Sequence, residues 1–167
     1  ISRYERPRFL DSALILKGNL SSDLTDLTSN YIGISGINAN LNNATSSDKI
    51  KIAASLINSS GSSTSLPSGD STVKLVFYCS NGIDYASVNF VLSGITATTN
   101  RYVAISKNMN QITKTSGFNW SAVNSLRVYS NVINSGSPSS NWAIALDGIR
   151  FENSSNANPL YGLVGYA

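Results

Sequence analysis

The sequence predicts an all-β fold, an antiparallel β-sandwich, and three observations favour it. Hydrophobic residues make up 41% of the 167 residues, enough for a core in one domain, whereas charged residues make up only 13%. Ser, Asn, Thr and Gly supply the remaining polarity, and these residues favour turns over helices. Many short segments alternate between apolar and polar residues, and no amphipathic segment of three helical turns is present.

Six segments alternate clearly enough to predict strands with one face toward a core. In one of them Leu126 and Val128 fall on the face opposite to Tyr129. Polar loops separate the segments, and Asn81-Gly82 is typical of a tight hairpin turn. The predicted strands are residues 49–57, 73–80, 87–92, 102–106, 126–132 and 142–151.

Four further segments give weaker indications of secondary structure. Residues 13–16 and 31–37 are candidate strands, and residues 20–27 and 109–113 are each long enough for one helical turn. Short strands with short loops between them are typical of a sandwich.

The two ends of the chain differ in composition from the middle. We expect an N-terminal arm over residues 1–18, the sandwich domain over 19–153, and a C-terminal apolar tail or linker over 154–167. An apolar tail of this kind packs on its own domain or docks onto a neighbouring subunit, and the sequence leaves both open. The candidate partner-binding residues of the tail are Pro159, Leu160, Tyr161, Leu163, Val164 and Tyr166.

The chain contains no histidine, which indicates that it is not an enzyme of the commonest kinds. A Ser-His-Asp or Cys-His arrangement cannot form, and a Cys/His zinc site is excluded. Cys79, the single cysteine, is expected as a small buried strand residue. Asp147 and Glu152 lie in or beside one predicted strand, but five positions apart they are expected on opposite faces. We therefore predict no catalytic residues.

Asp147 interrupts the apolar run of the last predicted strand. Within a core strand a carboxylate must be paired, hydrogen-bonded or bound to a metal. Calcium takes carboxylate and carbonyl oxygens, so Asp147 is a candidate ligand of a structural calcium ion. The favoured alternative is that it faces solvent or accepts backbone N–H groups. No other cofactor is indicated.

Tyrosine side chains on two strands are candidates for carbohydrate binding, because aromatic faces suit sugar rings. Tyr78 and Tyr129 are expected to point away from the core, which favours exposure. Core or edge packing is the alternative, and it is favoured for Trp120 and Trp142.

The formal net charge of +3 is small, and the densest basic stretch is Arg3, Arg6 and Arg8. A solvated terminal arm explains that stretch better than a phosphate-binding patch, so no nucleic-acid partner is expected. The sequence has no apolar run long enough to span a membrane.

Four motifs occur in order in the last part of the domain. They are NRYVAIS at 100–106, GFNWS at 117–121, VNSLRVY at 123–129 and WAIALDGIRF at 142–151. This order resembles the carboxyl-terminal part of jelly-roll domains of the galactose-binding and carbohydrate-binding-module type, over residues 70–153. The resemblance implies a jelly roll. It also implies that Asp147 matches a calcium-ligating aspartate of the last strand, although Gly148 stands where a second acid is found.

The segment NPLYGLVGY at 158–166 resembles a segment that follows such domains in bacteriophage virion and tail proteins, and the Ser/Asn-rich composition is similar to theirs. This resemblance implies a non-catalytic structural component of a virion, located in the tail, baseplate or fibre. Its partners would be other virion proteins or copies of itself, contacted through the terminal arms. The alternative is a secreted or virion-borne carbohydrate-binding module that attaches to glycans or a host surface.

Overall fold

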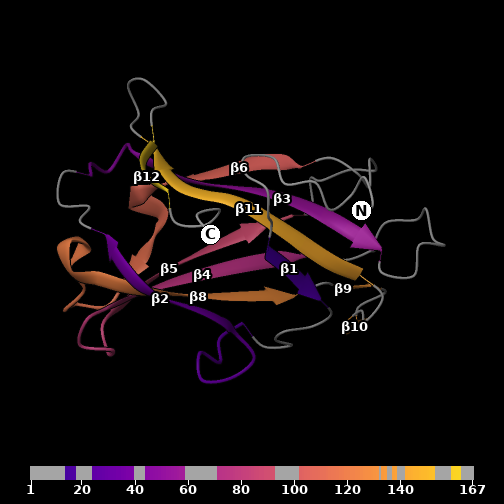
Figure 1. Cartoon of the computed structure of the whole chain (residues 1–167), viewed down its shortest axis with the longest axis horizontal. Helices are drawn as coiled ribbons and strands as arrows, with labels where there is room; N and C mark the ends of the chain where they lie inside the picture. Colours follow the sequence, from indigo (N-terminus) through magenta and orange to yellow (C-terminus); the bar gives the residue numbers. More distant parts are fainter. Residues whose placement is uncertain are drawn as a thin grey trace.

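The chain forms two antiparallel β-sheets that pack face to face, which confirms the predicted all-β sandwich (Figure 1). The computed structural model describes residues 14–17, 24–39, 44–58, 71–92, 102–131, 133–134, 137–138, 142–152 and 159–162. Within these residues the only helical elements are two single turns of 3-10 helix, η1 (Met109–Gln111) and η2 (Trp120–Ala122). The turn expected within 109–113 is therefore confirmed.

The strands divide between two five-stranded sheets and a small ribbon. Sheet A has the order β1 (Leu14–Lys17), β11 (Trp142–Glu152), β3 (Lys49–Asn58), β6 (Val103–Asn108), and β12 (Pro159–Gly162) also pairs with β11. Sheet B has the order β2 (Ile32–Ala39), β8 (Val123–Asn131), β4 (Thr72–Cys79), β5 (Tyr85–Val91), β7 (Thr113–Lys114). The ribbon pairs β9 (Ile133–Asn134) with β10 (Ser137–Pro138).

The strand pairings are nested around one central hairpin. β4 pairs with β5, then β3 with β6, β2 with β8 and β1 with β11, all antiparallel. Going outward from β4–β5, successive strand pairs lie alternately in sheet B and sheet A. Among the described strands, these four pairings are therefore nested one outside the other.

The turn at the centre of this hairpin is the one that Asn81-Gly82 predicts. Gly82 has a φ of +71°, a backbone conformation that glycine adopts without strain. The side-chain oxygen of Asn81 accepts hydrogen bonds from the backbone N–H groups of Ile83 and Asp84, each at 3.0 Å. The turn thus closes on its own polar side chain, as asparagine favours.

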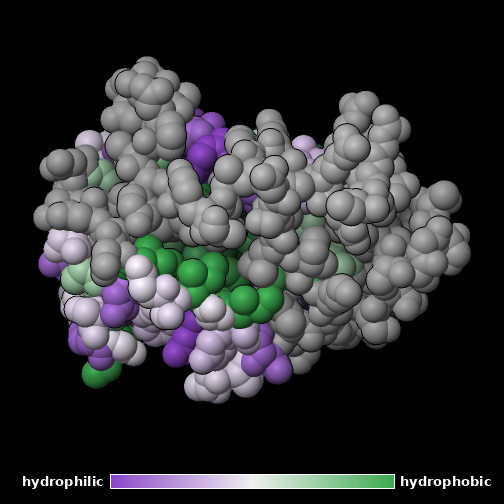
Figure 2. All heavy atoms as spheres, in the orientation of Figure 1, coloured by the Kyte–Doolittle hydropathy of each residue, from purple (hydrophilic) through white to green (hydrophobic). Residues whose placement is uncertain are grey.

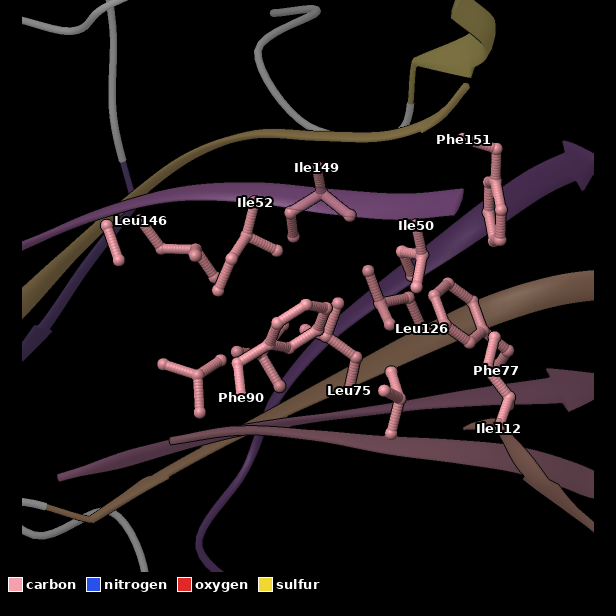
Figure 3. Packing of buried hydrophobic residues seen from close by; sticks show 14 of the residues in the cluster. Ile50, Ile52, Leu75, Phe77, Phe90, Ile112, Leu126, Leu146, Ile149 and Phe151 are labelled. Carbon is pink, nitrogen blue, oxygen red and sulfur yellow. The ribbon is translucent and has the colours of Figure 1, made fainter. Parts of the chain in front are cut away.

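The core lies between the sheets and is filled from both (Figure 3). Ile50 and Ile52 of sheet A face Leu75 and Phe77 of sheet B, and all four are fully buried. Burial of each such side chain contributes roughly 1.5–3 kcal/mol relative to exposure. The alternation predicted for these strands is confirmed.

One end of the core is closed by aromatic rings. Trp120 packs edge-on against Phe118 and Phe151, with ring centroids 4.7 and 5.6 Å apart, and lies 6.0 Å from Phe77. The expected core packing of Trp120 is thus confirmed, whereas the side chain of Trp142 lies outside the described residues. Cys79 is buried, as expected, and its thiol lies 3.5 Å from the carbonyl oxygen of Asn119.

β11 departs from the predicted alternation at a β-bulge. Its register to β3 shifts between Asp147, opposite Ala53, and Arg150, opposite Lys51, so β11 carries one extra residue. Gly148, with a φ of +58°, absorbs the kink. Strict alternation over residues 142–151 would place Gly148 on the same face as Leu146, and the bulge breaks that alternation. Beyond the bulge the core is filled instead by Ile149 and Phe151.

Both ends of the described chain belong to the sandwich. Leu16 of β1 is completely buried in the core, so the expected arm over residues 1–18 is wrong for residues 14–17. In β12, Tyr161 pairs with Phe151 and Pro159 with Glu152, so this part of the expected tail extends sheet A. For residues 159–162 the alternative of packing on the same domain is the one observed.

β2, an edge strand of sheet B, carries apolar residues. Ile32 and Ile34 are only partly buried and pack against the core. In the face shown in Figure 2, hydrophobic atoms gather near the middle, and the described surface below them is mostly hydrophilic.

No helix in the described part of the chain is long and apolar enough to cross a membrane.

Candidate functional site

The outer face of sheet B is covered by residues 24–31, which we call the strap. Lys74 donates a hydrogen bond of 2.6 Å to the carbonyl oxygen of Leu24. The carbonyl oxygen of Leu27 accepts from Arg127 at 3.0 Å and from the hydroxyl of Tyr129 at 2.8 Å. Leu24 and Leu27 also pack against the outer face. Polar and apolar contacts together therefore hold the strap on the sheet.

Arg127 is held between two aromatic rings beneath the strap. Its guanidinium carbon lies 4.3 Å from the ring centroid of Tyr31 and 4.5 Å from that of Tyr78. Tyr31 in turn lies 5.7 Å from Tyr129. Arginine between aromatic faces gains cation–π attraction while its fork reaches hydrogen-bond acceptors. Arg127 and the rings of Tyr31, Tyr78 and Tyr129 therefore form a cluster that holds the strap on sheet B, which we call the strap anchor.

This anchor corrects the predicted carbohydrate platform. Tyr78 and Tyr129 belong to a cluster separate from the main core, as their outward direction predicts. Their expected exposure is wrong, because Tyr78 is 7% exposed and Tyr129 is completely buried. Burial raises the pKa of Tyr129 to about 12. Neither ring is open to stack on a sugar while the strap is in place.

Asp147 is completely buried, so the expectation that it faces solvent is wrong. Its carboxylate accepts a hydrogen bond of 2.6 Å from the backbone N–H of Gly148, which agrees with the backbone-acceptor alternative. Burial, followed by the negative charge of Asp147, raises the pKa of Tyr102 to about 12. Within the described residues no group of three His, Cys, Asp or Glu side chains is placed to hold a metal ion. A calcium ion at Asp147 stays a prediction.

Glu152 lies on the same outer face of sheet A as Asp147. The bulge adds one residue between them, so the expectation that they point to opposite faces is wrong. The opposing residues Ala53 and Lys49 are four apart on β3, which separates the two carboxylates by about 13 Å. Paired glycosidase carboxylates lie about 5–9.5 Å apart, and these two do not meet that geometry.

The carboxylate of Glu152 is paired with two cations. It lies 2.5 Å from the ammonium nitrogen of Lys51 and 2.6 Å from Nε of Arg150. Burial alone would raise the pKa of Glu152, but the hydrogen bonds and charges of Lys51 and Arg150 bring it below its usual value. Glu152 is thus held ionised as part of the sheet.

The remaining described carboxylates fix turns. Asp84 accepts 2.8 Å hydrogen bonds from the side chains of Asn81 and Thr115, and these bonds lower its pKa. Asp48 is buried and accepts from the backbone N–H of Thr45 at 2.7 Å. Asp26 accepts from residues of its own turn within the strap.

An open groove of about 460 Å³ is lined by residues of β4, β5 and β7 in sheet B, of β6 in sheet A and of η1; we call it the lysine groove. Because Ser87 pairs with Thr113 and Lys74 with Asn89, these side chains form two adjacent rows on one face. Sequence patterns did not predict it, since its residues come from four elements and a neighbouring 3-10 turn far apart in the chain. The lining residues are Lys74, Ser87, Val88, Asn89, Lys107, Gln111 and Thr113.

Comparisons with known proteins add no assignment. No protein-family model matches the chain. No curated protein matches it significantly.

Proposed function

We propose that this chain is a non-catalytic structural component of a bacteriophage virion, of the tail, baseplate or fibre, built on a jelly roll. The observation that carries the proposal is the use of each described carboxylate. Asp26, Asp48 and Asp84 brace turns, Asp147 accepts a backbone N–H, and Glu152 is paired with two cations. Such carboxylates stabilise a scaffold and are poorly placed to exchange protons with a substrate.

The nested strand pairing supports the jelly-roll part of the proposal. A jelly roll is a two-sheet structure of paired Greek keys, in which one long hairpin is rolled up. Here the pairings β4–β5, β3–β6, β2–β8 and β1–β11 follow that scheme. A fold of this kind exposes few unprotected edges, which suits a rigid building block.

The virion part of the proposal is supported by the resemblance of residues 158–166 and by the place of β12. Because β12 pairs with β11, the chain leaves sheet A at Gly162 in a fixed position. Residues 163–167 would then contact neighbouring virion proteins or further copies of the chain. Leu163, Val164 and Tyr166 lie outside the described residues and remain the candidate partner-binding residues.

The test compares two truncations of the full chain. Removal of residues 163–167 keeps β12, whereas removal of 159–167 also removes the pairing with Arg150 and Phe151. We expect the full chain in particles released by the source bacterium, detected by mass spectrometry and antibody labelling in electron micrographs. Both truncated chains should fold, as judged by circular dichroism, but fail to enter particles. Absence of the full chain from particles would overturn the proposal.

A further inference from the structure

The edge strands of the two large sheets differ in how they are protected. A sheet edge presents unpaired backbone N–H and C=O groups, and proteins commonly protect it with lysine or proline. The edge strands β1, β6 and β7 carry Lys17, Lys107 and Lys114, and β12 begins with Pro159. None of the residues of β2 is charged and none is proline. Among the described edge strands, β2 is therefore the one that lacks both protections.

One regular stretch of β2 is open on its outer side. β2 pairs with β8 on one side, and no strand pairs with the other side in the part of the chain that the structure describes. The register to β8 shifts after Ser35, and Gly36 there has a φ of +77°. A bulge turns an edge away from a partner, so the available edge is Ile32–Ser35. Gly33 and Ser35 are exposed, in agreement with an uncovered edge.

The residues along this edge are complementary to a second copy of themselves. Ile32 and Ile34 are half-buried on the core face, and Gly33 lies between them. If two such edges pair antiparallel about a two-fold axis at Gly33, Ile32 of each copy lies opposite Ile34 of the other. Cross-strand pairs of β-branched residues stabilise a sheet. Glycine on the axis places no side chain between the copies.

Charge also favours an identical strand as the partner. Two copies of a lysine-bearing edge would bring like charges together, which destabilises strand pairing. Two β2 edges bring no charges together, and β2 offers no charge to select a partner of opposite sign.

We propose that two copies of the chain pair antiparallel through Ile32–Ser35, so that sheet B of one copy continues into sheet B of the other. Each copy uses the same strand, so the contact closes at the dimer and does not propagate. Because few residues take part, the dissociation constant should be on the order of tens of micromolar. This contact is independent of the proposed virion role, because it involves neither end of the chain.

The experiment measures the mass of the full chain by sedimentation and light scattering from about 5 to 500 μM, a range that brackets the expected dissociation constant. We expect the mass to rise from that of a monomer toward that of a dimer. Hydrogen exchange at the amides of residues 32–35 should be slower at the high concentration, because some of these amides then donate to the second copy.

A charge swap at Gly33 tests the position of the two-fold axis. Gly33→Lys and Gly33→Glu change an exposed residue and each place two like charges directly opposite one another. Each variant alone should dimerise at least about tenfold more weakly than the wild type, whereas an equal mixture of the two should regain association. Circular dichroism checks that both fold. The matched control is Ser106→Lys, at an exposed serine of the edge strand β6 in sheet A, which should leave dimerisation unchanged.

A chain that stays monomeric over the whole concentration range contradicts the proposal, and so does a mass that grows beyond the dimer. Failure of the Gly33→Lys and Gly33→Glu mixture to regain association would remove Gly33 from the axis. Equal weakening by Ser106→Lys would indicate general surface charge. If removal of residues 163–167 abolished the dimer and the Gly33 variants did not weaken it, the contact would belong to the tail and not to β2.

Discussion

Glu152 shows at the residue scale how a charge inside a sheet links stability to pH. Its pKa is lowered in the folded chain, so ionised Glu152 stabilises the fold at pH values above its unfolded pKa. This contribution is lost as the pH falls through the lowered pKa. Replacement by glutamine also leaves Lys51 and Arg150 without their carboxylate.

We predict that Glu152→Gln lowers the free energy of unfolding by about 1–3 kcal/mol at pH 7. At about pH 3, below the ordinary pKa of glutamate, the difference from the wild type should shrink, because the unfolded chain then binds a proton at Glu152 more readily than the folded chain does. Urea denaturation at both pH values measures this. Asp26→Asn, at an exposed turn, is the comparison variant. An equal loss of stability at both pH values would contradict the assignment of the effect to the charge of Glu152.

The strap is the clearest case at the scale of one element. Its backbone is held by the hydroxyl of Tyr129, which donates to the carbonyl oxygen of Leu27. Tyr129→Phe keeps the ring and removes this hydrogen bond, so it should lower the free energy of unfolding by about 1 kcal/mol. Hydrogen exchange at amides of the strap should become faster, while exchange in β4 and β8 stays slow.

Tyr31→Phe is the matched control for that experiment. The Tyr31 ring contacts Arg127 and Tyr129, but the structure shows no hydrogen bond of its hydroxyl in the described part of the chain. Removal of that hydroxyl should leave exchange in the strap unchanged. If both variants loosened the strap alike, the contact between Tyr129 and Leu27 would not be what holds it.

The same element scale shows what sequence patterns predict well and what they miss. Alternation predicted the strands and the direction of Tyr129, because each depends on residues next to one another in the chain. It missed the bulge at Gly148, because one extra residue inverts every later side chain. It also missed the cover over Tyr129, because Leu27 and Tyr129 are 102 residues apart. A weak signal existed in Leu24 and Leu27, two apolar residues in a polar segment.

At the scale of the whole molecule, the nested pairing brings the first and last parts of the described chain together in sheet A. β1 pairs with β11, which follows it after most of the sequence, and Leu16 enters the common core. A sandwich of this kind depends on long-range contacts. Loss of the outermost strand pair, β1 with β11, should therefore lower the stability of the whole domain and not of one region alone. Residues 13–16 gave a weak strand signal, but the different composition of the chain ends had assigned them to an arm.

Leu16→Ala tests this directly. Since Leu16 is completely buried, the substitution should lower the global free energy of unfolding by about 2–5 kcal/mol. Ile83→Ala, at a turn residue that is 77% exposed, should change it by less than about 0.5 kcal/mol. Denaturation is followed by the fluorescence of the two tryptophans, of which Trp120 packs against Phe77 of sheet B and Phe151 of sheet A. If Leu16→Ala lowered the free energy of unfolding as little as Ile83→Ala, β1 would not contribute to the stability of the sandwich. A large loss of unfolding free energy, with unfolding still in a single transition, would show that β1 is part of the cooperatively folded core. Its contacts would then be lost together with those between the two sheets.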